Sequence, residues 1–272
     1  MRGRSRALRH PLRCTRVQRP LDDLRTRLVS HHTPEAIRER IASGPQASYL
    51  RDFVYGAIDG AVTTFAVVSG VAGADLSSGI VLVLGLANLV GDGFSMAAGN
   101  WLGTRADAEL MARQRRAERM QIEVHPEGER AEVREIFRNK GFEGDDLERV
   151  TEVITSDTDR WIDVMLKEEH GMLGSARSPW RAAGATFVAF LVVGAIPILA
   201  YLVDLFRPGT LVHPLAWSCS LTAFAFFVTG AVKGKITGRR WPIAGIETLL
   251  VGGAAATLAY VVGVALGDLA RR

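Results

Sequence analysis

Two aspartates, Asp59 and Asp92, stand inside long apolar stretches and are the first residues in the sequence that suggest chemistry. A charged aspartate at the centre of a membrane helix costs about 3 kcal/mol on insertion scales, so such residues usually face a bundle interior or an aqueous path. Met96 follows Asp92 by four residues, which places both side chains on one helix face. A carboxylate oxygen and a thioether sulfur are donors that suit a borderline-soft divalent ion. The three residues therefore predict a path for such an ion.

Small residues flank the first of these aspartates. Gly56 and Gly60 have the small-xxx-small spacing that lets a second helix approach closely. The helix that carries Asp59 could therefore pack against its copy in a homodimer and bring two Asp59 carboxylates together. A structural interpretation stays open, in which Asp59 only accepts hydrogen bonds from Ser or Thr neighbours and Met96 fills space.

A second group of candidate ligands is mainly acidic and lies between residues 118 and 169. Its members recur at helical spacing and comprise Glu118, Gln121, Glu129, Glu132, Glu135, Glu168 and Glu169. Met165 lies four residues before Glu169 and thus on the same helix face. If the helices that carry this group pack together, its carboxylates could converge on hard divalent cations, with Met165 adding softness. For any one of these glutamates, a solvated helix face is the commoner explanation.

The elements that must position these residues are membrane helices. The chain has 272 residues, is 48% hydrophobic and carries a net charge of +4, but charges are sparse in residues 53–104 and 180–267. About 20 apolar residues in a helix cross a hydrocarbon core about 30 Å thick. Five stretches have this length, at residues 53–74, 79–102, 182–203, 211–232 and 243–266. This pattern excludes an ordinary soluble domain and makes a single buried helical core the weaker interpretation.

The Lys and Arg residues near the ends of these stretches predict their orientation. Basic residues concentrate before the first stretch, between the second and third, and between the fourth and fifth. Arg207 is the only Lys or Arg residue in the two loops on the opposite side. Arg271 and Arg272 at the C-terminus are exceptions to this distribution. We therefore expect the N-terminus and residues 105–178 in the cytoplasm and the C-terminus outside.

Four regions are predicted along the chain. Residues 1–48 are rich in Arg, lack the apolar run of a signal peptide and are expected to form a flexible basic cytoplasmic arm. Residues 49–104 hold transmembrane helices one and two, and residues 179–272 hold helices three to five. Residues 105–178, hereafter the middle segment, return to a soluble composition and are expected to form a cytoplasmic helical insert that binds metal.

Helix signals divide the middle segment. Residues 106–120 lack Gly and Pro and continue the second span, and Pro126 begins a new helix with an acidic first turn. Apolar periodicity then predicts three or four short amphipathic helices. His125 and His170 are isolated in the sequence, so we expect both to be exposed rather than ligating.

Three motifs together resemble the vacuolar iron transporter family. They are Tyr55-Gly-Ala-Ile-Asp59-Gly in the first span, Gly93-Phe-Ser-Met96-Ala-Ala-Gly-Asn in the second, and Trp161-Ile-Asp-Val-Met165-Leu-Lys-Glu-Glu169-His-Gly171 in the middle segment. The layout of five spans with an insert after the second agrees, and the resemblance covers about residues 49–267.

Members of that family are homodimers that move Fe²⁺, and often Mn²⁺ or other divalent ions, out of the cytosol in exchange for protons. The resemblance implies that Asp59 and Met96 line an ion path between the two subunits. It also implies that the middle segment is a metal-binding domain, with ligand positions at Glu118, Glu129, Glu132, Met165 and Glu169.

The sequence departs from the family pattern at several candidate positions. Gln121 stands where the family favours Glu, although Glu123 is close by, and Leu166 stands where a second Met is common. Asn100 occupies a position that is often Glu, whereas Asp92 is an additional carboxylate. The number of metals in the middle segment and the preferred ion are therefore left open.

We predict an all-α membrane protein with five transmembrane helices per subunit, a cytoplasmic helical insert between spans two and three, and a homodimeric assembly. Its expected function is export of Fe²⁺ and/or Mn²⁺ from the cytosol by proton antiport. The Gly, Ala and Arg content favours a prokaryotic plasma membrane. No permanently bound cofactor is expected, and Zn²⁺ and Co²⁺ are further candidate cargoes.

Two other classes of function, a metal-binding module without transport and an enzyme, fit the sequence less well. The alternative is a membrane-anchored metal-binding sensor or storage module without transport. An enzyme that uses Asp59 and Asp92 as an acid–base pair is disfavoured because no nucleophile accompanies them.

The expected partners are divalent ions, protons, the bilayer and a second copy of the chain. Nucleic acid is not among them, because the basic arm lacks interleaved aromatic residues.

Overall fold

The computed structural model describes residues 25–26, 28–43, 47–172 and 177–270, and its contacts divide the chain into two units, Met1–Gln46 and Ala47–Arg272. The described part of the first unit contains α2 (Pro34–Ala42). This helix begins after Thr33, whose hydroxyl accepts a hydrogen bond from the Ala36 amide. Most of the predicted basic arm, including residues 1–24, lies outside the described residues.

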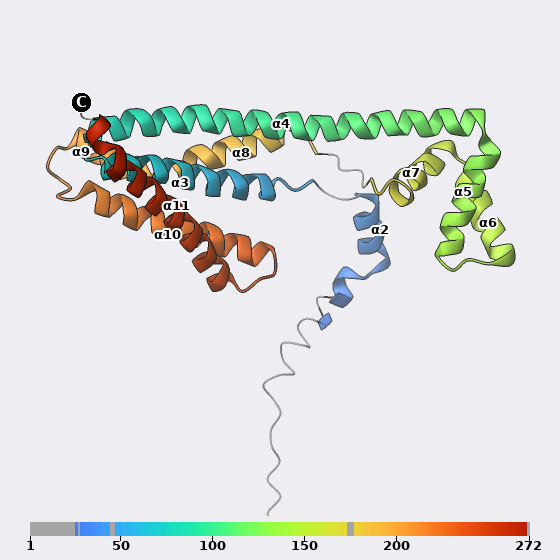
Figure 1. The fold of residues 1–272 in the computed structure, drawn as a ribbon. Helices are drawn as coiled ribbons and strands as arrows, with labels where there is room; N and C mark the ends of the chain where they lie inside the picture. Colours follow the sequence, from blue (N-terminus) through green and yellow to red (C-terminus); the bar gives the residue numbers. More distant parts are fainter. Residues whose placement is uncertain (1–24, 27, 44–46, 173–176, 271–272) are drawn as a thin grey trace, which may run out of the picture. The chain divides into compact units, whose positions relative to one another are not determined.

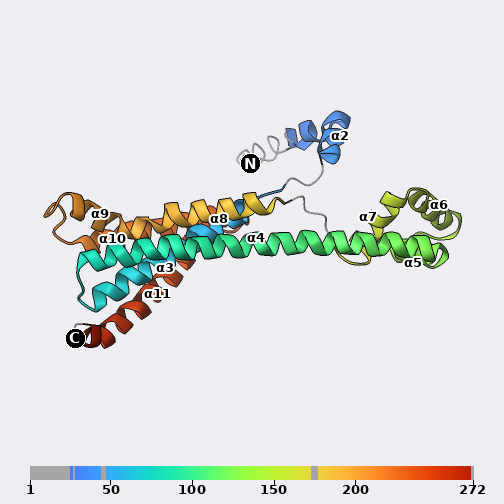
Figure 2. The same cartoon turned by 90° about the horizontal axis from the view of Figure 1, so that it is seen from above.

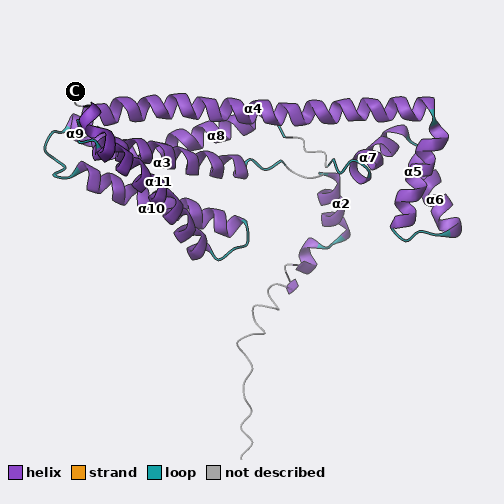
Figure 3. Cartoon of the chain, in the orientation of Figure 1, coloured by secondary structure: helices purple, strands orange, loops and turns teal. Residues whose placement is uncertain are grey.

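Membrane-length helices build the second unit, and Figure 3 colours no strand in the described ranges. Four of its described helices are long and apolar enough to cross a membrane, namely α3 (Leu50–Gly73), α4 (Ser78–Val124), α10 (Pro214–Ile236) and α11 (Trp241–Ala270). A bent pair, α8 (Pro179–Gly194) and α9 (Ile196–Phe206), would make a fifth span if the two are counted together. The prediction of an all-α membrane protein is confirmed.

The third predicted stretch, residues 182–203, is not one straight helix. It is divided at Ala195 into α8 and α9, whose axes are bent by 51°. Pro197 explains the break, because it has no amide hydrogen and its ring crowds the preceding turn. The Ser218 hydroxyl of α10 donates to the Pro197 carbonyl oxygen at 2.5 Å. This hydrogen bond ties α10 to α9 next to the break.

The glycine face of α3 packs against α8 of the same chain, and Figures 1 and 2 both show these two helices alongside each other. A Cβ atom on Gly56 would lie 2.3 Å from the Thr186 carbonyl oxygen. A Cβ atom on Gly60 would lie 2.5 Å from the Phe190 carbonyl oxygen. This finding corrects the expectation that the glycine face meets a second copy of the chain, because α8 already covers it.

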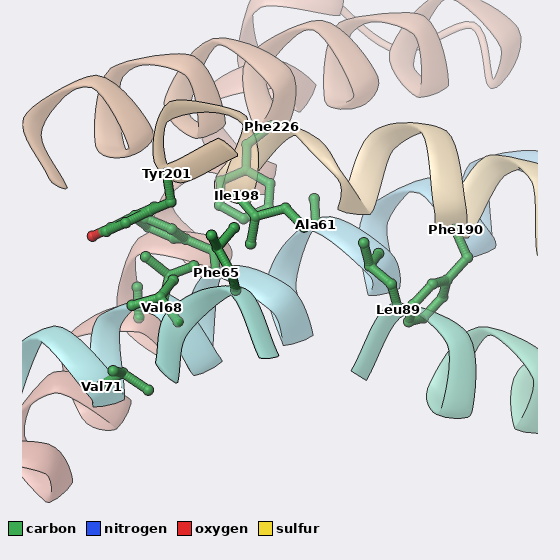
Figure 4. Packing of buried hydrophobic residues seen from close by; sticks show 12 residues of the cluster. Ala61, Phe65, Val68, Val71, Leu89, Phe190, Ile198, Tyr201 and Phe226 are labelled. Atoms are coloured by element: carbon green, nitrogen blue, oxygen red, sulfur yellow. The ribbon is translucent and has the colours of Figure 1, made fainter. Parts of the chain in front are cut away.

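An apolar cluster joins α3 to its neighbours (Figure 4). Phe65 and Val68 of α3 are buried with Ile198 of α9 and Phe226 of α10. The rings of Phe65 and Phe226 meet edge to face, with their centroids 6.3 Å apart. Because lipid tails are as apolar as these side chains, close packing stabilises such a cluster in a bilayer more than exclusion from water does.

The helix α4 is continuous over 47 residues. At about 1.5 Å per residue it is about 70 Å long, more than twice the thickness of a hydrocarbon core. Figures 1 and 2 show it running past α3 and α8 towards the short helices. A helix of this length is too long for one hydrocarbon core, in agreement with the predicted continuation of the second span.

Three short helices pack around the far end of α4, namely α5 (Pro126–Asn139), α6 (Gly144–Thr155) and α7 (Thr158–Glu168). Their apolar faces share a cluster that includes Ile122, Val133 and Ile162. The Arg119 guanidinium of α4 lies 2.7 Å from the Asp159 carboxylate of α7. This packing fixes the positions of the acidic side chains in the middle segment.

Candidate metal centre and ion path

The most buried carboxylate of the middle segment is that of Glu118 on α4, a residue only 2% exposed. Its Oε1 atom accepts a hydrogen bond from the Gln114 side-chain amide at 3.2 Å and lies 2.7 Å from Nε2 of His170. Its Oε2 atom is buried and has no hydrogen-bond partner within the described ranges. Buried polar atoms without partners are rare in proteins, and a carboxylate oxygen in this state is well suited to contact a bound cation.

His170 lies beside this carboxylate, contrary to the sequence expectation. Glu118, Glu169 and His170 form a group whose ligand atoms all lie within 4.8 Å of one another. The prediction that His170 is isolated and exposed was wrong, because its partner Glu118 is 52 residues earlier in the chain. His125 is exposed, as expected.

The helix α5 brings a second buried carboxylate to this group. Glu129 is 6% exposed, and its Oε2 atom also lacks a partner in the described part of the chain. The Glu129 carboxylate interacts electrostatically with those of Glu118, Glu132 and Glu169. Helices α4 and α5 and the end of α7 therefore direct carboxylates into one region. Their role as metal ligands stays a prediction.

The pKa values show that this arrangement disfavours negative charge. Burial, together with the neighbouring carboxylates of Glu132, Glu118 and Glu169, raises the pKa of Glu129 from 4.5 to about 7, although His170 acts to lower it. Burial also raises the pKa of Glu169. A divalent cation bound among these groups would offset their mutual repulsion and their loss of hydration.

Met165 is fully buried on α7 and packs in the apolar cluster beside Val133 and Trp161. This packing alone is sufficient to explain its burial. Its predicted role as a soft ligand is therefore carried by its helical spacing from Glu169 and remains a prediction.

Three accessory candidates of the middle segment are exposed, whereas Glu168 is half-buried. Gln121 and Glu123 are exposed. Glu135 forms an ion pair with Arg138, and the Glu168 carboxylate lies 2.6 Å from the Lys140 ammonium group. The hydrogen bond from Lys140 lowers the pKa of Glu168. Glu135 and Glu168 thus have basic partners of their own.

Asp59 is half-buried on α3 and lines an open groove of about 720 Å³. Tyr55 and Arg51 of α3 and Lys233 of α10 also line this groove. The Thr63 hydroxyl donates to the Asp59 main-chain carbonyl at 2.9 Å, and no described residue donates to the Asp59 carboxylate. The structural alternative, in which Ser or Thr neighbours satisfy this carboxylate, therefore finds no support.

Asp92 and Met96 of α4 have different surroundings. Asp92 is exposed, and its charge acts on that of Asp59. Met96 is half-buried and lines a second cavity, of about 490 Å³, to which α3, α4 and α8 contribute. Arg51 and Tyr55 line both this cavity and the Asp59 groove, so the two spaces adjoin.

A buried polar network beside Met96 includes two residues, Asp52 and Arg177, that were not candidates from the sequence. Asp52 is 7% exposed in the first turn of α3 and forms an ion pair with Arg177. Asn100, an accessory candidate, donates to the Asp52 carboxylate at 3.0 Å and to the Thr186 hydroxyl at 2.7 Å. Asp52 precedes Asp59 by seven residues, or two helical turns, and this spacing could have identified it. Its partner Arg177 is 125 residues away in the chain and could not have been identified in this way.

Comparison with known proteins places the chain in a family. Residues 50–264 match the family model described as the VIT family. The chain belongs to the VIT family. Its relatives include vacuolar iron transporter 1 of Arabidopsis thaliana, which is 31% identical over 236 residues, covering 86% of this chain and 89% of the relative. Vacuolar iron transporter 2 of Oryza sativa subsp. japonica is 31% identical over 78% of this chain and 85% of the relative. The vacuolar iron transporter of Toxoplasma gondii is 30% identical over 80% of this chain and 74% of the relative.

VIT-family membership confirms the resemblance inferred from the three motifs. The matched residues begin with α3 and end within α11, so they contain both the carboxylate group of the middle segment and the Asp59 groove. The VIT family is a family of transporters, which confirms that the chain is not an enzyme.

Proposed function

We propose that this VIT-family protein is a homodimeric transporter that exports Fe²⁺ and/or Mn²⁺ from the cytosol in exchange for protons. The observation that carries the proposal is the gathering of Glu118, Glu129, Glu169 and His170, with two buried carboxylate oxygens that lack partners among the described residues. The group lies on and around the far end of α4, and the same helix carries Met96 beside a cavity in the bundle. Ions collected by the middle segment thus have a continuous element leading to the membrane.

The proposed topology has five spans, with α8 and α9 together forming the third. The ion pair between Arg177 and Asp52 joins the end of the middle segment to the start of α3. This pairing supports a common, cytoplasmic side for both ends, as the distribution of basic residues predicts. The C-terminus then lies on the opposite side, and a prokaryotic plasma membrane is the location we propose.

The proposed path leads from the Met96 cavity to the Asp59 groove. A metal ion and a proton compete for one carboxylate, so a bundle that alternates its access can move protons against metal. The names of the relatives support iron as cargo. Oxygen and thioether donors suit Mn²⁺ as well, and geometry decides between such ions.

A second copy of the chain is proposed to cover the exposed face of α4. Asp92 is exposed there, next to large apolar side chains such as Val90 and Phe94, which are 61% and 68% exposed. A carboxylate against lipid is costly, whereas one at a subunit interface can face an aqueous path. Light scattering of the purified protein is expected to give twice the chain mass of 29.5 kDa, after correction for detergent. A monomeric mass would contradict the dimer.

The transport proposal is tested with the full-length protein in liposomes that contain a metal-sensitive dye. An acidic liposome interior is expected to accelerate Fe²⁺ uptake, because protons leaving the liposome then drive metal in. A flux that ignores the pH gradient would remove the antiport. Metal binding without any flux would instead favour the alternative of a membrane-anchored metal-binding module.

A further inference from the structure

His170 is held in a fixed place by the backbone at the end of α7. Its amide donates to the Met165 carbonyl oxygen at 3.3 Å, and the Met172 amide donates to the Leu166 carbonyl oxygen at 2.8 Å. Between them Gly171 adopts φ +64°, a left-handed conformation that ends the helix at little steric cost. The imidazole is therefore attached to an ordered turn rather than to a free loop.

The imidazole nitrogen lies where a shared ligand of one ion would lie. Nε2 of His170 is 2.7 Å from Oε1 of Glu118 and 3.6 Å from Oε2 of Glu169. Ligand atoms bonded to one zinc-sized ion at about 2.1 Å are separated by about 3 to 4 Å. The three donors therefore need only small adjustments to coordinate one ion.

Gln114 indicates how the hydrogens around Nε2 can be arranged. Its side-chain nitrogen is 2.9 Å from Nε2 of His170 and 3.2 Å from Oε1 of Glu118. An amide group carries two hydrogens, so it can donate one to each of these atoms. Nε2 is then the unprotonated ring nitrogen, and its single lone pair accepts from Gln114 while no metal is bound. Metal coordination requires Gln114 to release this lone pair, which then binds the ion.

A simple ion pair between protonated His170 and Glu118 accounts for less of the site. It would satisfy Oε1 of Glu118, but Oε2 of Glu118 and Oε2 of Glu129 would stay without partners within the described residues. These two buried oxygens are independent of the histidine geometry, and both belong to carboxylates that interact with His170 or with each other. A cation accounts together for the short contact between His170 and Glu118 and for the two buried oxygens without partners in the described ranges.

We propose that His170 is a metal ligand that, with Glu118 and Glu169, gives the middle segment a nitrogen-containing site favouring Zn²⁺ and Co²⁺ over Mn²⁺. Imidazole favours these later transition metals, whereas an all-carboxylate set suits Mn²⁺. The inference rests on the proposed transport function for its purpose, since it concerns which ions, beside the proposed Fe²⁺ cargo, the transporter's middle segment binds.

The experiment compares His170→Ala with the control His125→Ala in the full-length protein in detergent. Zn²⁺, Co²⁺ and Mn²⁺ are titrated separately by calorimetry, and the visible absorption of bound Co²⁺ reports the ligand type. His170→Ala is expected to weaken Zn²⁺ and Co²⁺ binding at least about tenfold and Mn²⁺ binding less than about threefold, and to change the Co²⁺ spectrum. The control is expected to change none of these.

An equal loss for all three ions, or no loss, would overturn the proposal and leave His170 as a structural partner of Glu118. If His170→Ala does not fold, His170→Gln keeps a polar side chain at the position and is expected to show the same selective loss. A selective loss of Zn²⁺ and Co²⁺ binding in a protein that shows no metal flux would support His170 as a ligand and contradict transport. Failure of the ligand proposal and failure of the transport proposal are therefore distinguishable.

Discussion

Glu129 is a side chain whose charged form is disfavoured in the folded protein. Its carboxyl group is buried on α5 and faces the charges of three other glutamates. Without a cation, removing the proton from Glu129 is unfavourable, and this explains its pKa of about 7. A divalent ion bound as we propose would reverse this preference and would couple metal occupancy to the stability of the middle segment.

The first prediction concerns the pH dependence of this segment. Between its unfolded pKa of 4.5 and its folded pKa of about 7, Glu129 holds more proton in the folded state than in the unfolded state. The free energy of unfolding of the metal-free segment should therefore fall as pH rises through this window, by about 1–3 kcal/mol. Glu169, whose pKa is also raised, acts in the same direction.

Hydrogen-exchange protection factors for residues 126–166 of the full-length protein measure this effect. Protection is expected to decrease from pH 5 to about pH 7.5 and to recover when Zn²⁺ or Mn²⁺ is added. Glu129→Gln should flatten the pH dependence, and Glu135→Gln, a change at an exposed residue, should not. Protection that rises with pH in the metal-free protein would contradict the prediction.

Side chains with nearby partners in the sequence could be predicted, and those with distant partners could not. The spacing of Asp92 and Met96, and of Met165 and Glu169, is visible in the sequence. His170 looked isolated because Glu118 belongs to another helix. Asp52 and Arg177 were missed for the same reason, since only the packing of α3 against the end of the middle segment joins them.

The contact between α3 and α8 depends on the absence of side chains on one face of α3. Gly56→Ala would place a methyl group against the backbone of Thr186, where neither helix can yield easily. We expect a loss of about 1–3 kcal/mol, seen as a lower thermal unfolding temperature in detergent. Gly253→Ala is the control, because nothing lies within 4 Å of the position of its added methyl group. Equal unfolding temperatures for the two variants would contradict the close packing.

The ion pair at the start of α3 makes a separate prediction. Asp52→Ala removes a buried carboxylate that pairs with Arg177 and accepts a hydrogen bond from Asn100. The expected cost is about 3 kcal/mol, because a largely buried guanidinium would lose its partner. Glu247→Ala removes a carboxylate that lies 3.3 Å from Arg239 on the surface and should cost less than about 1 kcal/mol. Similar unfolding temperatures for both variants would show that the Asp52 pair is not structural.

The elements themselves were largely predictable, because apolar length and helix signals act within one segment. Residues 53–74, 79–102, 211–232 and 243–266 largely coincide with the long helices that the structure shows. The bend between α8 and α9 was not predicted, because a proline in a membrane helix is compatible with several geometries. In the structure, Gly194 at the end of α8 lies so close to α3 that an added Cβ atom would be 2.8 Å from the Gly60 carbonyl oxygen.

Across the whole molecule, two groups of carboxylates are separated along α4. The group in the middle segment lies outside the apolar part of the chain, whereas Asp59 and Asp92 lie within the membrane-length helices. In our proposal the first group collects ions and the second passes them across the bilayer. Binding and flux should therefore respond separately to substitutions in the two places.

The proposal that a divalent ion crosses the membrane past Asp59 is tested most directly by the Fe²⁺ flux of Asp59→Asn in liposomes. Metal binding to the middle segment is measured on the same preparation. We expect binding equal to that of the wild type and a flux reduced at least about tenfold, because the substitution removes a charge from the ion path only. Asp204→Asn, the same change near the end of α9, should leave both unchanged. Full flux through Asp59→Asn would contradict the claim that a divalent ion crosses the membrane past this carboxylate.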